Sequence, residues 1–258
     1  MNQTFNKIEM KELLDHYYLE FNTACFIEND PISIPHKFSQ KEDIEISAFF
    51  VALIAWGNRS SIIKSGNRLI QLMDDAPADF IRSHTSKDLK RFELFCHRTF
   101  NGSDVQFLIS SLQRIYLDYG GLENLFVTKS KTETAFVAIE NFRNVLFQYE
   151  HLNRVEKHIS NPLKNSACKR LHMFLRWMVR KDEMDVDFGI WNTLSPSQLI
   201  CPLDVHTARV SRKLGLLVRS QNDRKAAEEL TQNLSYLCKE DPVKYDFALF
   251  GAGVNNVL

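Results

Sequence analysis

The chain has 258 residues, its 32 lysines and arginines equal its 32 aspartates and glutamates, and 44% of its residues are hydrophobic. This length allows one large domain or two small ones with buried cores, and the composition is typical of a globular protein. A net charge of zero lacks the basic balance that often marks nucleic-acid-binding proteins, so such a function would depend on local placement of charge.

Cysteine spacing and hydropathy limit the remaining classes. Five cysteines are scattered without a C-x-x-C pair, which argues against zinc and iron–sulfur sites and predicts free thiols. The first 21 residues do not resemble a signal peptide, and the longest apolar stretch, Ile46 to Trp56, is too short to span a bilayer. We therefore expect a cytoplasmic protein with no metal, no cofactor and no membrane association, and the sequence indicates no protein partner.

Helical periodicity recurs along the chain, and only 9 glycines and 7 prolines interrupt it. In chain order, the predicted helices cover residues 8–21, 44–56, 104–119, 132–148, 167–179, 205–214, 223–237 and 242–250. The helix over 44–56 is apolar on nearly every side, which is typical of a buried central helix. Ser103 is expected to cap the helix over 104–119, and Gly120 is expected to end it. No strand pattern of comparable strength occurs.

Proline-containing breaks divide the helices without forming a true linker; they fall at residues 30–35, 160–163 and 195–202. The sequence therefore predicts an all-α protein that forms a single compact domain over residues 1–258. Its possible lobes are residues 40–160 and residues 1–39 plus 161–258, with a cleft between them. The sequence assigns no function to residues 76–150.

Two charged residues at predicted helix starts are candidates for chemistry. Lys169 lies in the first turn of a helix, where the helix dipole favours anions, so its charge is electrostatically misplaced. Asp204 follows Pro202-Leu203 and opens the next helix, where aspartate is a preferred N-cap. A solvated lysine and a capping aspartate are the simple interpretations, but a capping carboxylate can also project into a cleft.

The segment PLDVHTARVSRKLGL around Asp204 resembles the proline–aspartate segment of helix-hairpin-helix DNA glycosylases. The resemblance covers Ile46 to Asn58 and Asn161 to Gly253. It implies that Asp204 is the catalytic carboxylate and that Lys169 is the nucleophile of a bifunctional member. The interval of 35 residues between them is long and similar to that of the archaeal 8-oxoguanine glycosylase branch.

Four further residues match substrate-binding positions of that branch. In KYDFALFGAG, Asp246 and Phe250 are four apart, and the resemblance implies that they hold and stack a flipped base. Met173 matches the other half of the base sandwich, and Asn58, after ALIAWG, matches an amide that contacts the nucleotide. On residue type alone, plain core positions are the favoured interpretation of Met173 and Phe250, and a helix C-cap suits Asn58 as well as a nucleotide contact does.

The segment that matches the DNA-gripping hairpin departs from the family pattern. Relatives use a glycine-rich turn whose backbone N–H groups bind a phosphate, whereas NPLKNS over residues 161–166 has no glycine. Asn165 can take the left-handed conformation in place of glycine. Lys164, Arg170 and Arg209 are candidate contacts to the DNA backbone, as are Arg176 and Arg212.

These residue types suit cleavage of an N-glycosidic bond. A carboxylate stabilises the positive charge that develops on the sugar, and a neutral amine can attack C1′. We expect the helix N-terminus, Arg170 and partial burial to favour the neutral amine of Lys169. The sequence thus predicts a base-excision repair enzyme that acts on damaged duplex DNA, with 8-oxoguanine as the leading substrate.

Three alternatives remain open. The first is a non-catalytic nucleic-acid-binding protein on the same fold, which the missing hairpin glycines favour. The second is a helical scaffold for protein interactions, which the zero net charge favours. The third is a metal hydrolase that uses Asp204 and His206, although two residues so close in sequence do not share a helical face.

Overall fold

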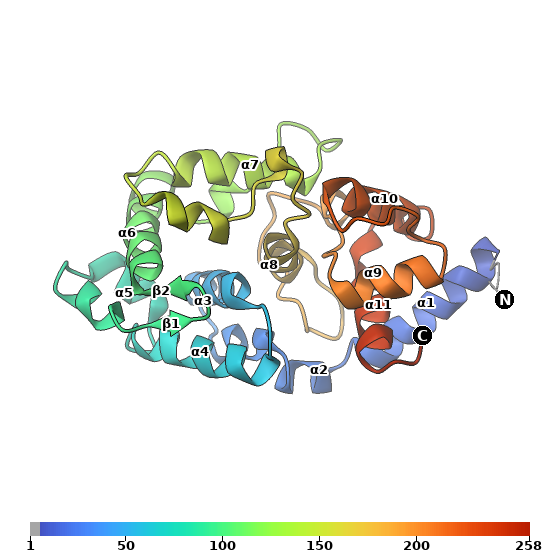
Figure 1. The fold of residues 1–258 in the computed structure, drawn as a ribbon, viewed down its shortest axis with the longest axis horizontal. Coiled ribbons are helices and arrows are strands. Elements are labelled where there is room, and N and C mark those ends of the chain that lie inside the picture. Colours follow the sequence, from blue (N-terminus) through green and yellow to red (C-terminus); the bar gives the residue numbers. More distant parts are fainter. Residues whose placement is uncertain (1–5) are drawn as a thin grey trace. The chain divides into compact units, whose positions relative to one another are not determined.

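The computed structural model describes residues 6–258, which are helical through most of their length (Figure 1). Strand is limited to a hairpin of two residues a side, β1 (Cys96–His97) and β2 (Phe100–Asn101). The predicted all-α class is therefore confirmed. Contacts divide the chain into two units. The first contains the described residues up to Phe26 with Thr128–Ile139 and Ser160–Leu258, and the second contains Ile27–Val127 and Glu140–Ile159.

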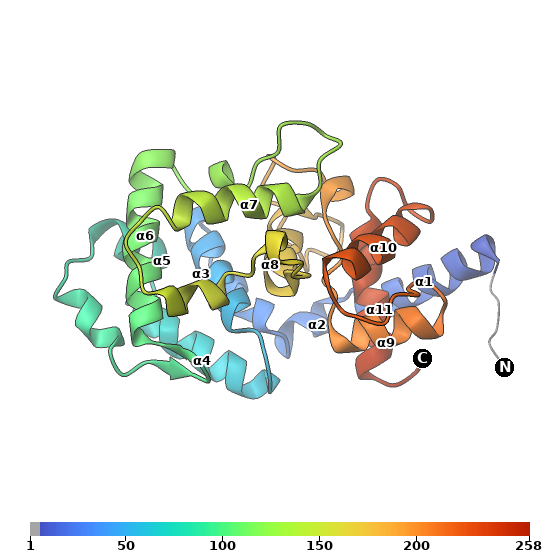
Figure 2. The same cartoon turned by 45° about the horizontal axis from the view of Figure 1, so that its top comes forward.

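The first unit is built around the C-terminal helix. Its helices are α1 (Lys7–Phe21), α8 (Lys169–Val179), α9 (Val205–Lys213), α10 (Arg224–Ser235) and α11 (Tyr245–Val254). Helix α11 packs against both α1 and α9 (Figures 1 and 2). Two glycines permit these close approaches, because a Cβ on Gly251 would lie 2.3 Å from the ring of Phe21 and one on Gly253 would lie 2.9 Å from Cβ of His206.

The second unit surrounds a central apolar helix. Its helices are α3 (Lys41–Ile54), α4 (Arg59–Gln71), α5 (Pro77–Ser83) and α6 (Gly102–Tyr119). Every residue of α3 from Ile44 to Ile54 is buried, as the sequence predicted. Helices α4 and α5 both pack against α3, and α6 packs against α5 (Figure 2). Two helices cross the division between the units, α2 (Ala24–Glu28) and α7 (Ala135–Leu146).

The proline-containing breaks form short 3₁₀ helices: Pro31–Ser33, Pro35–Lys37, Pro162–Lys164, Pro196–Gln198 and Pro242–Lys244. Three more 3₁₀ segments are Asp88–Phe92, Glu123–Leu125 and Asn153–His158. Proline lacks an N–H and has a fixed φ, so it suits the first position of such a turn. The last break makes α11 begin at Tyr245, three residues later than predicted.

The prediction that Ser103 caps α6 is wrong. The cap is Asn101, whose side chain accepts the N–H of Asp104, while the carboxylate of Asp104 accepts the N–H of Asn101. Ser103 lies inside the helix and donates its hydroxyl to Asn101. The predicted end is correct, because Gly120 is left-handed with φ 76°. Across residues 6–258, no helix has both the length and the apolar character that crossing a bilayer requires.

Candidate active site

Lys169 is the first residue of α8, which begins two residues later than predicted, so the lysine lies in the first turn as expected. The turn before it contains two left-handed residues, Asn165 at φ 60° and Cys168 at φ 47°. Asn165 thus takes the conformation that was expected to replace a hairpin glycine. Cys168 is the N-cap residue but makes no side-chain hydrogen bond to the helix. The helix therefore begins without a polar cap, and the ammonium group of Lys169 lies on the first turn.

Asp204 is the N-cap of α9, and its two carboxylate oxygens have different partners. Oδ1 accepts the backbone N–H of Thr207 at 2.8 Å, which is a normal capping bond. Oδ2 faces Lys169, with its Nζ at 4.0 Å. The capping interpretation is therefore confirmed, and the second carboxylate oxygen is left facing Lys169.

The Lys169–Asp204 pair is partly exposed to solvent. The lysine side chain is 33% exposed and the aspartate side chain 13% exposed, so solvent reaches both. A separation of 4.0 Å is at the upper limit for a salt bridge and beyond hydrogen-bond distance, so the ammonium group is not held in a direct bond. The two residues are 35 positions apart in sequence and come together at the starts of two helices.

Asp246 lies in the first turn of α11 and is buried close to this pair. Its Oδ2 accepts a hydrogen bond from Nη1 of Arg176 at 2.5 Å, and its Oδ1 accepts the Thr207 hydroxyl at 3.4 Å. The thiol of Cys201 lies 3.9 Å from the same Oδ1. Burial raises the pKa of Asp246 to about 6, and the negative charge of Asp204 contributes in the same direction. The predicted recognition of a base edge by Asp246 would compete with these contacts.

Arg176 and Arg180 are buried, although arginine is usually found at the surface. Arg176 is 4% exposed and pairs with Asp187 as well as Asp246. Arg180 is 1% exposed and pairs with Asp187, Asp182 and Asp241. The interpretation of Arg176 as a phosphate contact is therefore wrong, because its guanidinium group is enclosed between carboxylates. Four apolar residues of α8 are buried as well: Leu171, Phe174, Leu175 and Met178.

Met173 and Phe250, the predicted base sandwich, are both half-buried in the first unit. Met173 lies one turn after Lys169 on α8. The ring of Phe250 packs edge-on against Phe26, with centroids 6.4 Å apart, and against His206, with centroids 6.2 Å apart. Both side chains keep an exposed portion, and their role in stacking a base stays a prediction.

The hairpin turn satisfies its own backbone. The N–H of Leu163 donates to the side chain of Asn161, that of Lys164 to the carbonyl of Asn161 and that of Asn165 to the carbonyl of Pro162. These amides point into the turn and not outward, as a phosphate grip would require. Lys164 is exposed at the end of the turn, and its contact with a phosphate stays a prediction.

The three other predicted backbone contacts have different surroundings. Arg212 donates to the carbonyl of Arg219 and to the side chain of Asn222. Arg170 is half-buried, and desolvation lowers its pKa to about 10. Arg209 is exposed, and its guanidinium group donates to the carbonyls of Gly253 and Leu258 and to the side chain of Asn256. A phosphate at Arg209 would compete with the segment after α11.

Asn58 belongs to the second unit. It is exposed and is the N-cap of α4, where its Oδ1 accepts the N–H of Ser61 at 3.2 Å and the hydroxyl of Ser60 at 2.6 Å. The expectation of a C-cap at the end of the preceding helix is therefore wrong, because Asn58 caps the beginning of α4 and Ala55 is the C-cap of α3. Its contact with a nucleotide stays a prediction.

Sequence reasoning missed Thr207 and Asp187. Thr207 contacts both Asp204 and Asp246, and its place three residues after an N-cap was the pattern that could have identified the first contact. Asp187 lies in a stretch without periodicity, so nothing in the sequence indicated its pairing with Arg176. Among residues 6–258, no group of three or more His, Cys, Asp or Glu side chains is arranged to hold a metal ion.

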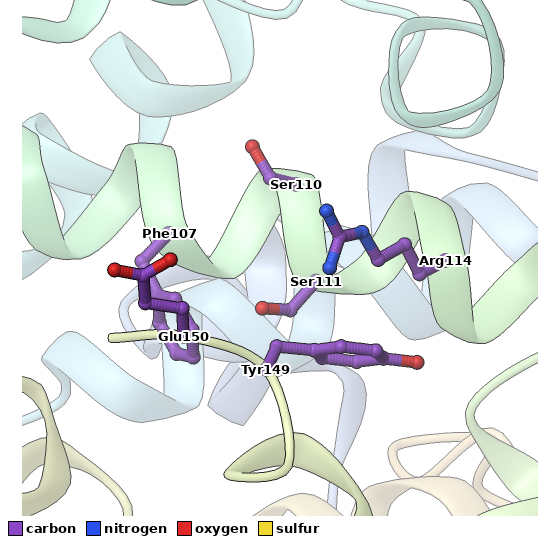
Figure 3. Close-up of a pocket in the computed structure, with 6 residues that line it drawn as sticks. All are labelled: Phe107, Ser110, Ser111, Arg114, Tyr149 and Glu150. Atoms are coloured by element: carbon purple, nitrogen blue, oxygen red, sulfur yellow. The ribbon is translucent and has the colours of Figure 1, made fainter.

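The second unit contains a surface hollow of about 250 Å³, lined by Phe107, Ser110, Ser111, Arg114, Tyr149 and Glu150 (Figure 3). The guanidinium carbon of Arg114 lies 5.2 Å from the centre of the Tyr149 ring, and the figure shows the two side chains next to each other. This hollow includes none of the residues that the sequence predicted for the site.

Comparison with known proteins identifies a family. The model of the family described as "Protein of unknown function (DUF2400)" matches residues 30–255. This match covers most of the chain, so the chain belongs to that family. No curated protein and no solved structure was found to match it. The family description gives no activity, so function has to be argued from the site.

Proposed function

We propose that this member of the family is a DNA N-glycosylase with AP-lyase activity that removes an oxidised purine, such as 8-oxoguanine, from duplex DNA. The helix-hairpin-helix glycosylase arrangement, with a cleft that admits DNA, is part of the proposal, as is a cytoplasmic location. The observation that supports it is the separation of 4.0 Å between Lys169 Nζ and Asp204 Oδ2. Two residues singled out separately in the sequence thus form one partly exposed pair.

The pair supplies the two groups that the reaction needs. As the C1′–N9 bond breaks, positive charge develops on the sugar, and the carboxylate of Asp204 stabilises it. The neutral amine of Lys169 forms a new bond to C1′, and the released base takes up a proton. Loss of the amine proton and opening of the sugar ring give an imine. β-Elimination of the 3′ phosphate then cleaves the strand, and hydrolysis of the imine releases the enzyme.

The base must leave the duplex before its glycosidic bond can be reached, and this costs a few kcal/mol. Met173 and Phe250 would offset part of that cost by stacking on the base, because each keeps an exposed apolar portion in the same unit as the pair. Lys164 would approach the phosphate backbone by charge, since the amides of the hairpin turn bond within the turn.

The proposal is tested by trapping the imine with borohydride, which reduces it to a stable amine. Purified protein is incubated with a duplex that carries 8-oxoguanine and with a second duplex that carries an abasic site. The wild type is expected to give a covalent protein–DNA band with both. Lys169→Gln and Lys169→Ala are expected to give none, because neither side chain can form an imine.

A matched control is Lys225→Gln, which removes an exposed lysine from α10 in the same unit and should leave trapping unchanged. An undiminished band in Lys169→Ala would overturn the assignment of the nucleophile. A wild type that binds DNA in a salt-dependent manner, but gives no band on either duplex, would favour the non-catalytic nucleic-acid-binding alternative.

A further inference from the structure

We propose that Asp246 is a positioning residue for the Lys169–Asp204 pair and that it acts through Thr207. The inference rests on the proposed function and assigns Asp246 a role other than recognition of the base. The inference starts from Thr207, which donates a hydrogen bond to each of two carboxylates. The backbone N–H of Thr207 donates to Oδ1 of Asp204 at 2.8 Å, and its hydroxyl donates to Oδ1 of Asp246 at 3.4 Å.

Burial makes this bridge specific. Thr207 is 0% exposed and Asp246 is 5% exposed, so neither contact is replaced easily by solvent. Arg176 Nη1 holds the other oxygen of Asp246 at 2.5 Å, and Asp187 in turn holds Arg176. Asp246 is thus fixed from behind by α8 and points its Oδ1 towards the start of α9, where Asp204 lies.

The charges around Asp246 come from each neighbouring element. Helix α8 contributes Arg176 and Lys169. The segment before α9 contributes the thiol of Cys201, and Asp204 is the N-cap of α9. Helix α1 contacts residues close to Asp246 in sequence: Asp15 pairs with Lys244, and the Tyr18 ring lies 6.4 Å from that of Phe247. Lys169, Arg176, Asp204 and Asp246 therefore form a cluster of two cations and two carboxylates that includes the reactive pair.

Loss of charge on Asp246 would change this balance. Burial is the largest cause that raises its pKa to about 6, the charge of Asp204 adds to it, and Arg176 and Lys169 oppose it. Above that pH, the charged carboxylate of Asp246 is a strong acceptor for the Thr207 hydroxyl. Below it, the neutral carboxyl group is a weaker acceptor and holds Thr207 less firmly, so the rate of imine formation should fall as the pH falls through about 6.

An abasic duplex separates positioning from base recognition, because it contains no base to recognise. We would measure the single-turnover rate of borohydride trapping on abasic and 8-oxoguanine duplexes between about pH 5 and 9. Asp246→Asn is expected to slow both substrates by a similar factor of ~10 at pH 7.5 and to remove the fall on the acid side. Thermal unfolding of each variant shows whether it is folded.

Thr207 gives a second test that does not depend on the stability of Asp246→Asn. Thr207→Val removes the hydroxyl and keeps the backbone N–H, so the acid-side midpoint should move to higher pH because Asp246 loses a donor. Thr207→Ser should restore the wild-type profile. Ser211→Ala is the matched control, since it removes a buried hydroxyl one turn later on α9 that bonds to no residue among those described.

The outcomes separate the two proposals. No trapping by the wild type on either duplex would overturn the proposed function itself. Trapping by the wild type, with Asp246→Asn slowed on 8-oxoguanine alone, would overturn the positioning role and support base recognition. Wild-type pH profiles in both Asp246→Asn and Thr207→Val would overturn the inference while leaving the proposed function in place.

Discussion

The side-chain amide of Asn165 donates to Oδ2 of Asp223 at 2.9 Å and thereby joins the hairpin turn to the beginning of α10. Asp223 is the N-cap of α10, where its Oδ1 accepts the N–H of Ala226, and Arg219 holds both of its oxygens. The N–H of Arg224 also donates to the carbonyl of Asn165. The turn before Lys169 is therefore held by two bonds to a helix almost 60 residues away.

Replacement of Asn165 should separate its two contributions. Asn165→Ala loses the hydrogen bond to Asp223 and also places alanine at φ 60°, a left-handed conformation that alanine tolerates less well than asparagine. The free energy of unfolding should therefore fall by about 2 kcal/mol. Asn165→Gly loses only the bond and should cost about 1 kcal/mol or less. Urea denaturation measures both variants. Equal losses in the two would show that the left-handed conformation contributes nothing.

Asp204 offers a test that separates capping from chemistry. Asparagine is as good an N-cap as aspartate, so the free energy of unfolding of Asp204→Asn should lie within about 0.5 kcal/mol of the wild-type value. It should nevertheless slow trapping by about a hundredfold, because the charge that stabilises the sugar cation is gone. Asp204→Ala should lose about 1 kcal/mol of stability as well. Trapping by Asp204→Asn at the wild-type rate would leave Asp204 as a cap alone.

His172 should make the protein sensitive to acid. It is 1% exposed with its ring edge-on to Phe136, and burial, followed by the charge of Arg224, lowers its pKa to about 3. Its usual pKa is near 6.5, so between these values the unfolded chain binds a proton that the folded chain does not. The contribution of the neutral ring to stability is therefore complete above about pH 6.5 and decreases as the pH falls towards 3.

His172→Leu removes this titration and keeps an apolar side chain of similar size. The variant should gain stability relative to the wild type as the pH falls from 6.5 to 4, by on the order of 3 kcal/mol. Urea denaturation across this pH range gives the difference in free energy of unfolding between the two proteins. The groups that titrate in both proteins contribute equally and cancel in this difference. A difference that does not change with pH would contradict the buried neutral histidine.

Gly251 should be intolerant of a side chain although it lies in a helix. A Cβ there would lie 2.3 Å from the ring of Phe21, so Gly251→Ala should destabilise the packing of α1 on α11 by about 1 to 3 kcal/mol. This exceeds the gain of about 1 kcal/mol that alanine gives in a helix. Phe21→Leu in the same chain should recover part of the loss. Thermal unfolding of the single and double variants tests the contact.

Much of the helical fold could be predicted because burial repeats at helical spacing. The apolar run of α3 and the end of α6 at Gly120 were read correctly. Helix α4 was missed because its sequence is rich in serine, lysine and arginine, although four of its residues are buried at helical spacing: Ile62, Gly66, Leu69 and Ile70. The cap of α6 was assigned to Ser103 because serine and asparagine both suit that position, and only the bond to Asp104 distinguishes them.

The site was predictable where its chemistry is local. Lys169 stood out against the helix dipole and Asp204 as a cap, and both are properties of a few neighbouring residues. The burial of Arg176 could not be read, because its partners Asp187 and Asp246 are 11 and 70 residues away. A charged residue on a helix is usually solvated, and only the folded structure shows that carboxylates surround Arg176.

The buried ion pairs of α8 have a consequence for how a substrate would be received. Arg176 and Arg180 anchor the same helix that carries Lys169, and any shift of that helix would separate charges in a medium of low polarity. Lys169 therefore lies on a helix that these buried ion pairs hold in place. On the proposed function, binding would incur little reorganisation within this unit, and the deformation would fall on the nucleic acid.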